Sequence, residues 1–387
     1  MKKDMEKIIN CFLYCLFAVL IFSTTLSQLF TFLLILFWLS SIIQGKRSYS
    51  LETFIGIAVV CLIFFRLLSV PFSVDFKASL KASGKVFFYL IFFVILDNID
   101  LRDKSKLRRL LSIFFYTAVL AASYGTGKYL LSKESRIMST TGGWGTLGMY
   151  LTAVFAPVLY LGGSRQWFSG RLIWWIGICI ILTGIILTFG RIHWLITFLF
   201  VLLVGLRRER KILVLSILVL CFLFFFHRPF RERILTLRHP LRESSGRDVL
   251  WQDAMNKLGQ RPVVGYGLNT FKKVFTSFDS SADKGVGTWH NEFLQMYMES
   301  GLPGFLAFLG LFLTIFLTLL KLKKTIKDSF YLDLGVALGL SFLAFFLTCF
   351  TGGFMLDPNT SLQFFILAGI LGKISYIYGV SKNERSG

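Results

Sequence analysis

Residues 172–206 have the sequence LIWWIGICIILTGIILTFGRIHWLITFLFVLLVGL, in which Arg191 is the only charged residue. A helix that crosses a lipid bilayer needs about 20 predominantly apolar residues. This stretch therefore predicts two consecutive membrane spans, 172–189 and 191–206, that meet at Arg191 with almost no loop between them.

The apolar composition extends over the whole chain of 387 residues. Apolar residues make up 55% and charged residues 16%, whereas a typical soluble domain has about 25% charged residues. These values exclude an ordinary water-soluble globule and a disordered chain. They supply about 213 apolar residues (55% of 387), enough for ten to twelve spans of about 20 residues each.

The apolar runs predict an all-α, polytopic membrane protein with about 12 transmembrane helices. The twelve runs lie near 8–22, 26–43, 51–69, 84–97, 109–127, 146–162, 172–189, 191–206, 211–227, 291–320, 331–350 and 361–379. The chain is thereby divided into residues 1–226 with helices 1–9, residues 227–290 with one long loop, and residues 291–387 with helices 10–12.

The short basic loops predict which ends of the spans face the cytoplasm. With the N-terminus inside, 22 of the 42 Lys and Arg residues fall in the seven inner segments, as the positive-inside rule requires. Both termini are therefore expected to be cytoplasmic. The net charge of +21 fits inner loops that lie against an anionic leaflet.

Two outer segments are also basic. The first runs from Val70 to Lys85 and includes Lys77 and Lys81, and the second is the loop 227–290, with eleven Lys and Arg against six Asp and Glu. A solvated basic surface explains this excess, and so does attraction to a polyanion at the outer surface. No nucleic-acid-binding module is visible, so nucleic acid is not expected as a partner.

The long loop contains a predicted amphipathic helix and a candidate catalytic histidine. Leu250, Trp251, Ala254 and Leu258 recur at helical spacing after Ser245-Gly246, and Gly259 ends the pattern. His290 lies where the loop meets the next span, and it is either a general base or a hydrogen-bonding interfacial residue. His193, His227 and His239 are weaker candidates.

Arg191 is a functional candidate because an arginine at membrane depth costs about 3 kcal/mol on insertion scales. The alternative is that its side chain extends to the lipid headgroups. Arg66 raises the same question. Asp357, before Pro358, either orients a histidine or caps the following span.

Other motifs give weaker evidence of function. Gly143-Trp144-Gly145-Thr146-Leu147-Gly148 fits G-x-G-x-x-G but follows no strand, so helix packing explains it better than a nucleotide. Asp279 and Asp283 are weak metal candidates, and the six cysteines show neither a disulfide nor a metal pattern. We expect neither a metal nor a cofactor.

Four motifs together resemble the O-antigen ligase/O-antigen polymerase family. They are the Gly190-Arg191 step, Arg247-x-x-x-Trp251, the turn Pro262–Gly267, and His290-Asn291 followed after nine residues by Gly301 and after two more by Gly304. The close resemblance covers residues 185–200 and 240–310. The chain departs from the commonest family pattern at Phe189-Gly190, where a serine usually precedes the arginine.

The resemblance implies a GT-C-type glycosyltransferase whose active site faces the periplasm from the bacterial inner membrane. The implied donor is a glycan on undecaprenyl diphosphate, and the implied acceptor in the ligase branch is a sugar hydroxyl of lipid A–core. His290 matches the general base, and Arg191 and Arg247 match diphosphate-binding arginines. The further substrate-binding candidates are Lys81, Lys85, Asn291 and Asp357, and Gly301 and Gly304 are motif glycines.

An O-antigen ligase is therefore the leading hypothesis, with the donor, the acceptor and membrane lipids as partners. The nearest alternative is an O-antigen polymerase that extends lipid-linked repeats. A protein O-oligosaccharyltransferase is a third possibility. A non-enzymatic transporter of lipid-linked sugar belongs to a different class, but internal repeats and spans broken at mid-bilayer, which would favour it, are not visible.

Overall fold

The computed structural model describes residues 2–45, 52–101, 103–132, 136–162, 167, 170–208, 210–235, 247–276 and 287–379. Throughout these ranges every regular element is a helix, so the all-α prediction is confirmed. Three residues considered above, His239, Asp279 and Asp283, lie outside the described ranges, as do Ser245 and Gly246 before the amphipathic helix.

The first ten α-helices cover the first nine predicted apolar runs, with α4 and α5 together at the fourth run. They are α1 (Lys2–Val19), α2 (Thr24–Ile43), α3 (Phe54–Leu68), α4 (Phe76–Phe87), α5 (Ile91–Asn98), α6 (Lys104–Leu131), α7 (Trp144–Leu161), α8 (Arg171–Leu187), α9 (Arg191–Arg207) and α10 (Arg210–Phe226). Side-chain caps mark several starts. Asp75, for example, accepts a hydrogen bond from the backbone N–H of Ala78 at the start of α4.

The fourth predicted span begins earlier than expected. Helix α4 continues through a 3-10 turn (Phe88–Leu90) into α5, and the apolar unit runs from Phe76 to Asn98. Lys77, Lys81 and Lys85 therefore lie on a helix rather than in a loop. These lysines interrupt the apolar run in the sequence, but Ser79, Ala82 and Val86 form a buried face between them.

The second half of the chain contains short helices and then three long ones. The short ones are α11 (Arg228–Leu235), α12 (Arg247–Lys257) and α13 (Phe271–Val274), and the long ones are α15 (Glu292–Thr325), α16 (Ser329–Thr348) and α17 (Pro358–Ile377). Helix α12 confirms that the predicted segment is helical, with Leu250 and Ala254 buried.

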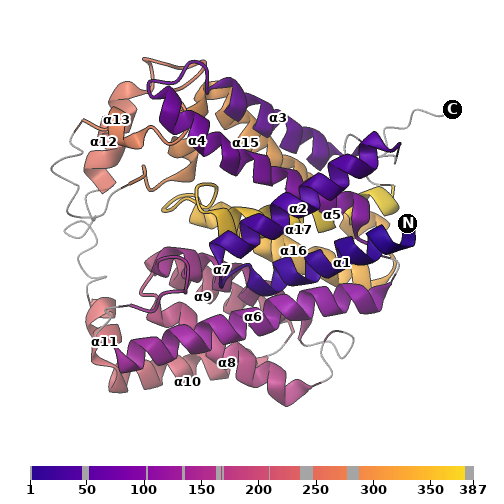
Figure 1. The fold of residues 1–387 in the computed structure, drawn as a ribbon. Coiled ribbons are helices and arrows are strands. Elements are labelled where there is room, and N and C mark those ends of the chain that lie inside the picture. Colours follow the sequence, from indigo (N-terminus) through magenta and orange to yellow (C-terminus); the bar gives the residue numbers. More distant parts are fainter. Residues whose placement is uncertain are drawn as a thin grey trace.

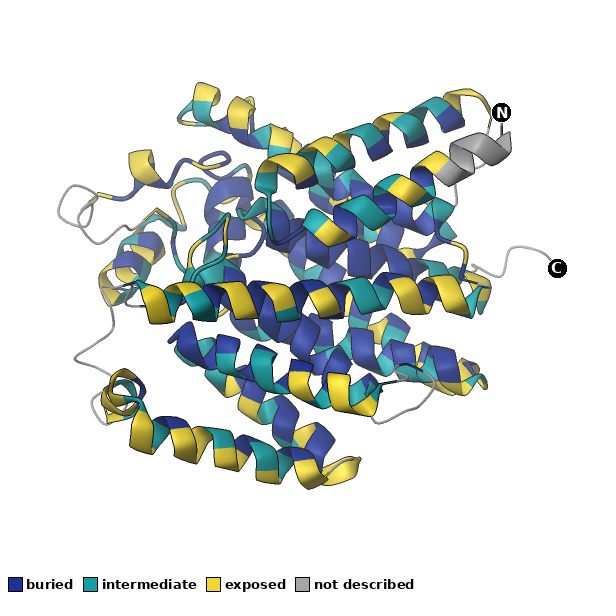
Figure 2. Cartoon of the chain, turned by 60° about the horizontal axis from the view of Figure 1, so that its bottom comes forward, coloured by how far each residue is buried: buried dark blue, intermediate teal, exposed yellow. Residues whose placement is uncertain are grey.

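Helix α17 lies at the centre of the bundle. Every residue from Asn359 to Ser375 except Lys373 is buried, and α17 packs against α5, α7, α15 and α16. Around it α16 packs on α7, α15 on α3, and α6 on α8. Figure 2 shows the buried residues between the helices and the exposed residues on their outward faces. Many of these are large and apolar, such as Phe198, Phe222 and Phe225, as lipid-facing surfaces require.

The structure is that of a polytopic membrane protein. Seven helices of the described ranges are long and apolar enough to cross a bilayer, or up to eight if the bent pair α10 and α11 is one span. Shorter apolar helices lie at 8–19, 54–68 and 171–187. Each of the twelve predicted runs is helical, and the count of twelve crossings stays a prediction.

One end of the bundle carries the connections that contain the candidate residues. In Figure 1, α12 and α13 lie beside the start of α4 at this end, and α11 lies at the same end below them. Helix α1 begins, and α17 finishes, at the opposite end. The arrangement gathers the starts of α7, α9, α12 and α15 at one end of the bundle.

Candidate functional site

Arg191 begins helix α9 after a tight turn. The turn places Phe189 in the left-handed region, with φ of 54°, and the ring of Phe189 stacks on that of His227 with 6.1 Å between centroids. The indole of Trp194 donates a hydrogen bond to the carbonyl of Ile186 at 2.9 Å. These contacts fix the start of α9, and Arg191 is partly buried there.

Arg136 lies beside the same turn, although 55 positions separate it from Arg191. The backbone N–H of Ile137 donates to the carbonyl of Leu187, the last residue of α8, at 3.1 Å. The guanidinium group of Arg136 lies 4.5 Å from the ring centroid of Trp144, where a cation–π contact holds it. Burial and the positive charge of Arg191 lower the pKa of Arg136.

Arg247, at the start of α12, belongs to the same group of cations. Burial, and then the charge of Arg191, lower its pKa. Like charges shift each other's pKa only when they lie near one another. Neither Arg136 nor Arg247 forms an ion pair with a carboxylate of the described ranges. Arg136 and Arg247, from separate segments, thus each lie near Arg191, and we call these three arginines the cationic group.

His290 completes this group. It is partly buried, and its backbone has a φ of 49°, a conformation that costs about 1–3 kcal/mol in a non-glycine residue and is concentrated at functional sites. Burial and the charge of Arg247 lower the pKa of His290 below its ordinary value. The imidazole is therefore neutral near pH 7 and able to accept a proton.

A hydrogen bond between α12 and the His290 loop explains why Arg247 and His290 are neighbours. The indole N–H of Trp251 donates to the carbonyl of Trp289 at 3.0 Å. Arg247 lies four positions before Trp251, on the same face of α12. The ring of Trp289 is buried against Phe271, with 4.9 Å between centroids.

The motif glycines shape the backbone below His290. Gly301 interrupts α15 with φ 67° and ψ −171°, and a Cβ there would lie 2.3 Å from the carbonyl oxygen of Val263. A Cβ on Gly304 would lie 2.3 Å from that of Ser300. These glycines permit close approach of the chain and act through packing.

The other candidates have local partners. Asn291 caps α15 by accepting a hydrogen bond from the N–H of Leu294. Asp357 caps α17 and also accepts a hydrogen bond from the hydroxyl of Thr146 at 2.8 Å, which corresponds to the capping alternative. Lys85 donates to the carbonyl of Leu356 at 2.9 Å, and Lys81 is exposed.

The remaining candidates lie outside the cationic group. Arg66 forms a buried ion pair with Glu299, and His193 packs against Gly148 of the G-x-G-x-x-G stretch. In the ranges that the structure describes, no group of three His, Cys, Asp or Glu residues is arranged to hold a metal ion.

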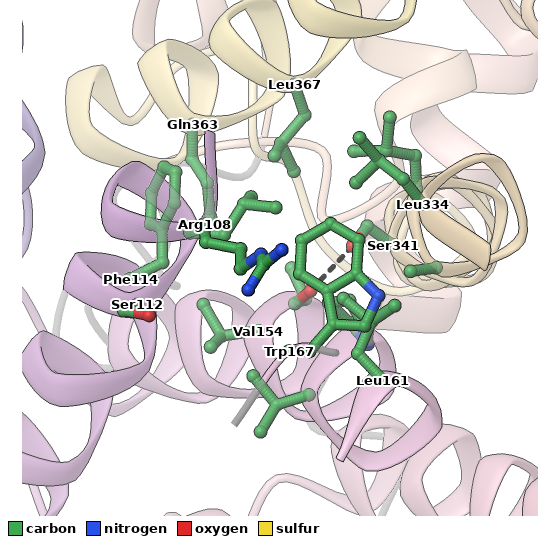
Figure 3. A pocket seen from close by; sticks show the side chains of 16 residues that line it. Arg108, Ser112, Phe114, Val154, Leu161, Trp167, Leu334, Ser341, Gln363 and Leu367 are labelled. Carbon is green, nitrogen blue, oxygen red and sulfur yellow. Dashed lines mark hydrogen bonds between the residues drawn. The ribbon is translucent and has the colours of Figure 1, made fainter. Parts of the chain in front are cut away.

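Two cavities differ in size and setting. A cavity of about 420 Å³ lies between α8, α9, α10 and α11, with an almost entirely apolar lining that includes Trp194, Phe198 and Phe230, and Arg191 on its wall. A small cavity of about 30 Å³, lined by Arg108, Trp167 and Gln363 among others (Figure 3), has room for about one water molecule. Only the larger cavity adjoins the cationic group.

Comparison with known families finds a similarity in this part of the chain. Residues 176–309 match the model of the O-antigen ligase family. The match covers 134 of the 387 residues, about a third of the chain. The matched segment extends from α8 into the first half of α15 and contains Arg191, Arg247, His290 and Gly301. None of the curated proteins matches the sequence.

Sequence reasoning missed Arg136, which lies before the segment that matches the family model. The loop 132–143 has no unusual composition, so only its place on the predicted outer side, together with its arginine, could have indicated a role. The domain match supports a ligase-like activity on glycans in a membrane.

Proposed function

We propose that this protein is an O-antigen ligase, which transfers a preassembled glycan from undecaprenyl diphosphate to a sugar hydroxyl of lipid A–core at the periplasmic face of the bacterial inner membrane. The observation that carries the proposal is that one neutral histidine, His290, lies near the partly buried Arg247, and that Arg247 and Arg136 each lie near the partly buried Arg191. The family match over residues 176–309 supports it independently.

Each group has a task in the proposed transfer. The acceptor hydroxyl attacks C1 of the first donor sugar and gives its proton to the imidazole of His290. The bond between C1 and the diphosphate oxygen breaks, and its electron pair leaves with the diphosphate. Arginine side chains form bidentate, charge-assisted hydrogen bonds with such oxygens and stabilise the growing charge. A single displacement inverts the anomeric centre.

The apolar cavity beside Arg191 suits the lipid part of the donor. Its walls come from α8 to α11, and it adjoins the cationic group. A polyprenyl chain in this cavity would hold its diphosphate near Arg191, Arg136 and Arg247. Binding there would bring the reacting sugar next to His290 before the acceptor arrives, which is the proximity effect.

The decisive experiment is reconstitution of the transfer. The purified full chain is mixed with lipid-linked glycan and lipopolysaccharide that lacks O-antigen, and the product is followed by gel. We expect transfer by the wild-type protein and none by His290→Ala, although the variant still inserts into the membrane. Full activity of His290→Ala would refute the mechanism.

Gene deletion distinguishes the ligase from its alternatives. Loss of the whole ladder from lipopolysaccharide, with accumulation of lipid-linked polymer, indicates a ligase. Core capped by a single repeat indicates a polymerase, and transfer to a pilin-like protein indicates a protein O-oligosaccharyltransferase. Flipping of lipid-linked sugar in liposomes without transfer would indicate a transporter.

A further inference from the structure

Trp289, the residue that precedes His290, is held at both of its backbone polar groups. The indole of Trp251 donates a hydrogen bond to the carbonyl of Trp289 at 3.0 Å, and the N–H of Trp289 donates to the side-chain Oε1 of Gln295 at 3.1 Å. The orientation of the two peptides on either side of the Trp289 Cα sets the direction in which the next residue, His290, leaves the backbone. Gln295 holds the Thr288–Trp289 peptide and Trp251 holds the Trp289–His290 peptide, so together they fix the backbone of Trp289.

The orientation of the Gln295 amide is fixed by Glu299. The Nε2 of Gln295 donates to Oε1 of Glu299 at 2.6 Å. An ionised carboxylate only accepts hydrogen bonds, so the NH₂ group of Gln295 must face Glu299. Its oxygen then necessarily faces the N–H of Trp289.

Glu299 is itself held by two further groups. Its Oε2 forms an ion pair with Arg66 of α3 at 2.9 Å, with 3% and 2% of the two side chains exposed. Its Oε1 also accepts the backbone N–H of Asn269 at 2.8 Å. Removing one partner from such a pair leaves an uncompensated charge, so the geometry is strongly favoured.

We propose that Arg66, Glu299 and Gln295 are positioning residues, which fix the imidazole of His290 for proton transfer through the hydrogen bond from the backbone N–H of Trp289 to Gln295. This inference rests on the proposed function of His290. The three side chains are buried, and the hydrogen-bond and ion-pair partners described for them are Met296, Asn269 and Trp289 besides one another. They act on the base and leave the binding of the donor diphosphate unchanged.

The test uses Gln295→Leu, which keeps the side chain close in volume and removes both of its hydrogen bonds. A displacement of about 1 Å at a reacting group costs up to about 100-fold in rate. We expect kcat to fall about 10- to 100-fold, while the KM for lipid-linked glycan changes less than about two-fold. Gln363→Leu is the matched control, because Gln363 is equally buried in α17 and has no link to the His290 loop.

A second variant keeps the test valid if Gln295→Leu does not fold. Trp251→Phe removes the hydrogen bond to the carbonyl of Trp289 and keeps an aromatic ring. We expect a similar loss in kcat, and in the double variant a loss smaller than the product of the two, since both side chains hold the backbone of the same residue, Trp289. Trp174→Phe, which removes a comparable bond to the carbonyl of Val158, is the control with wild-type kcat.

Hydrogen exchange gives a readout that does not depend on catalysis. The amides of residues 288–291 should exchange faster in Gln295→Leu than in wild type or Gln363→Leu. Unchanged exchange with wild-type kcat would overturn the inference, and so would equal losses in kcat and donor binding. If His290→Ala retains full transfer, the proposed function fails, whereas faster exchange in Gln295→Leu would still establish the hydrogen-bonded link.

Discussion

The backbones of Gly265 and Gly301 meet with no space for a side chain on either residue. A Cβ on Gly265 would lie 2.6 Å from the backbone nitrogen of Gly301, and both residues have a positive φ. The contact joins the turn after α12 to the kink of α15. The N–H of Leu302 donates to the carbonyl of Pro262 at the same place, so two separate family motifs form one structural unit.

The first prediction concerns this contact. Gly301→Ala should destabilise the protein, because its backbone conformation alone costs about 1–3 kcal/mol in a residue with a side chain and the added carbon overlaps Val263. We expect a lower melting temperature in detergent and little transfer activity. Gly310→Ala, on the same helix with open space around it, should be close to wild type. Equal melting of the two variants would contradict this explanation.

The second prediction concerns pH. Neutral His290 is the active form, and burial and Arg247 lower its pKa. In a plot of kcat/KM against pH, the fall on the acid side (the acid limb) should therefore lie below pH 6.5, which is the ordinary pKa of histidine. Arg247→Gln removes a positive charge that disfavours the imidazolium, so the pKa of His290 rises and the limb moves to higher pH.

Arg136→Gln is the control for the pH profile. The charge of Arg136 is coupled to that of Arg191 and is not among the influences on His290. The acid limb of the pH profile of Arg136→Gln should lie at the same pH as that of the wild type, although the variant binds the donor more weakly. The same displacement in both variants would show that the limb does not report on Arg247 and His290.

The third prediction is that Arg136 binds the donor. A charge-assisted hydrogen bond contributes about 1.5–3 kcal/mol, so Arg136→Gln should raise the KM for lipid-linked glycan about 10- to 100-fold. Arg261→Gln is the control, since the guanidinium group of Arg261 bonds to the carbonyl of Phe72 and is not coupled to the cationic group. Inhibition by pyrophosphate should weaken in Arg136→Gln only. Equal KM values for the two variants would exclude Arg136 from the site.

The fourth prediction is independence from divalent metals. Three guanidinium groups can stabilise the charge of the departing diphosphate without a metal ion. EDTA should leave the rate of the purified protein unchanged. Loss of transfer in EDTA, followed by recovery with Mg²⁺ or Mn²⁺, would show that the arginines are insufficient.

The helices could be predicted from the sequence because a long apolar run has few stable alternatives in a membrane. The start of α4 was missed because Lys77, Lys81 and Lys85 interrupt its run, and the face made by Ser79 and Val86 is only weakly apolar. Local composition therefore predicts the apolar parts of helices well, and it misses the first turns of a helix where those turns are amphipathic, as in α4.

The site was partly predictable for a different reason. Each of three residues could be predicted as a site residue on its own, because it stands in a motif or at membrane depth: Arg191, Arg247 and His290. Arg136 could not, because its place beside Arg191 depends on a backbone bond between Ile137 and Leu187, which no local pattern encodes. A stronger signal existed for Arg66 and Glu299: opposite charges in two apolar spans are expected to pair.

The fifth prediction concerns that pair. Arg66→Met leaves the Glu299 carboxylate buried without its counter-charge, which typically costs about 3–5 kcal/mol. We expect a marked fall in the melting temperature and in the yield of folded protein. The neutral double variant Arg66→Met/Glu299→Gln should recover most of the stability, because removing both charges of a buried pair is often neutral.

Lys104→Met is the control, since the Lys104–Asp328 pair is partly exposed and such pairs contribute little. A melting temperature of Arg66→Met equal to that of Lys104→Met would show that Glu299 does not depend on Arg66. We expect the double variant to recover stability but not kcat. The glutamine that replaces Glu299 can donate as well as accept hydrogen bonds, so the NH₂ group of Gln295 is no longer required to face position 299.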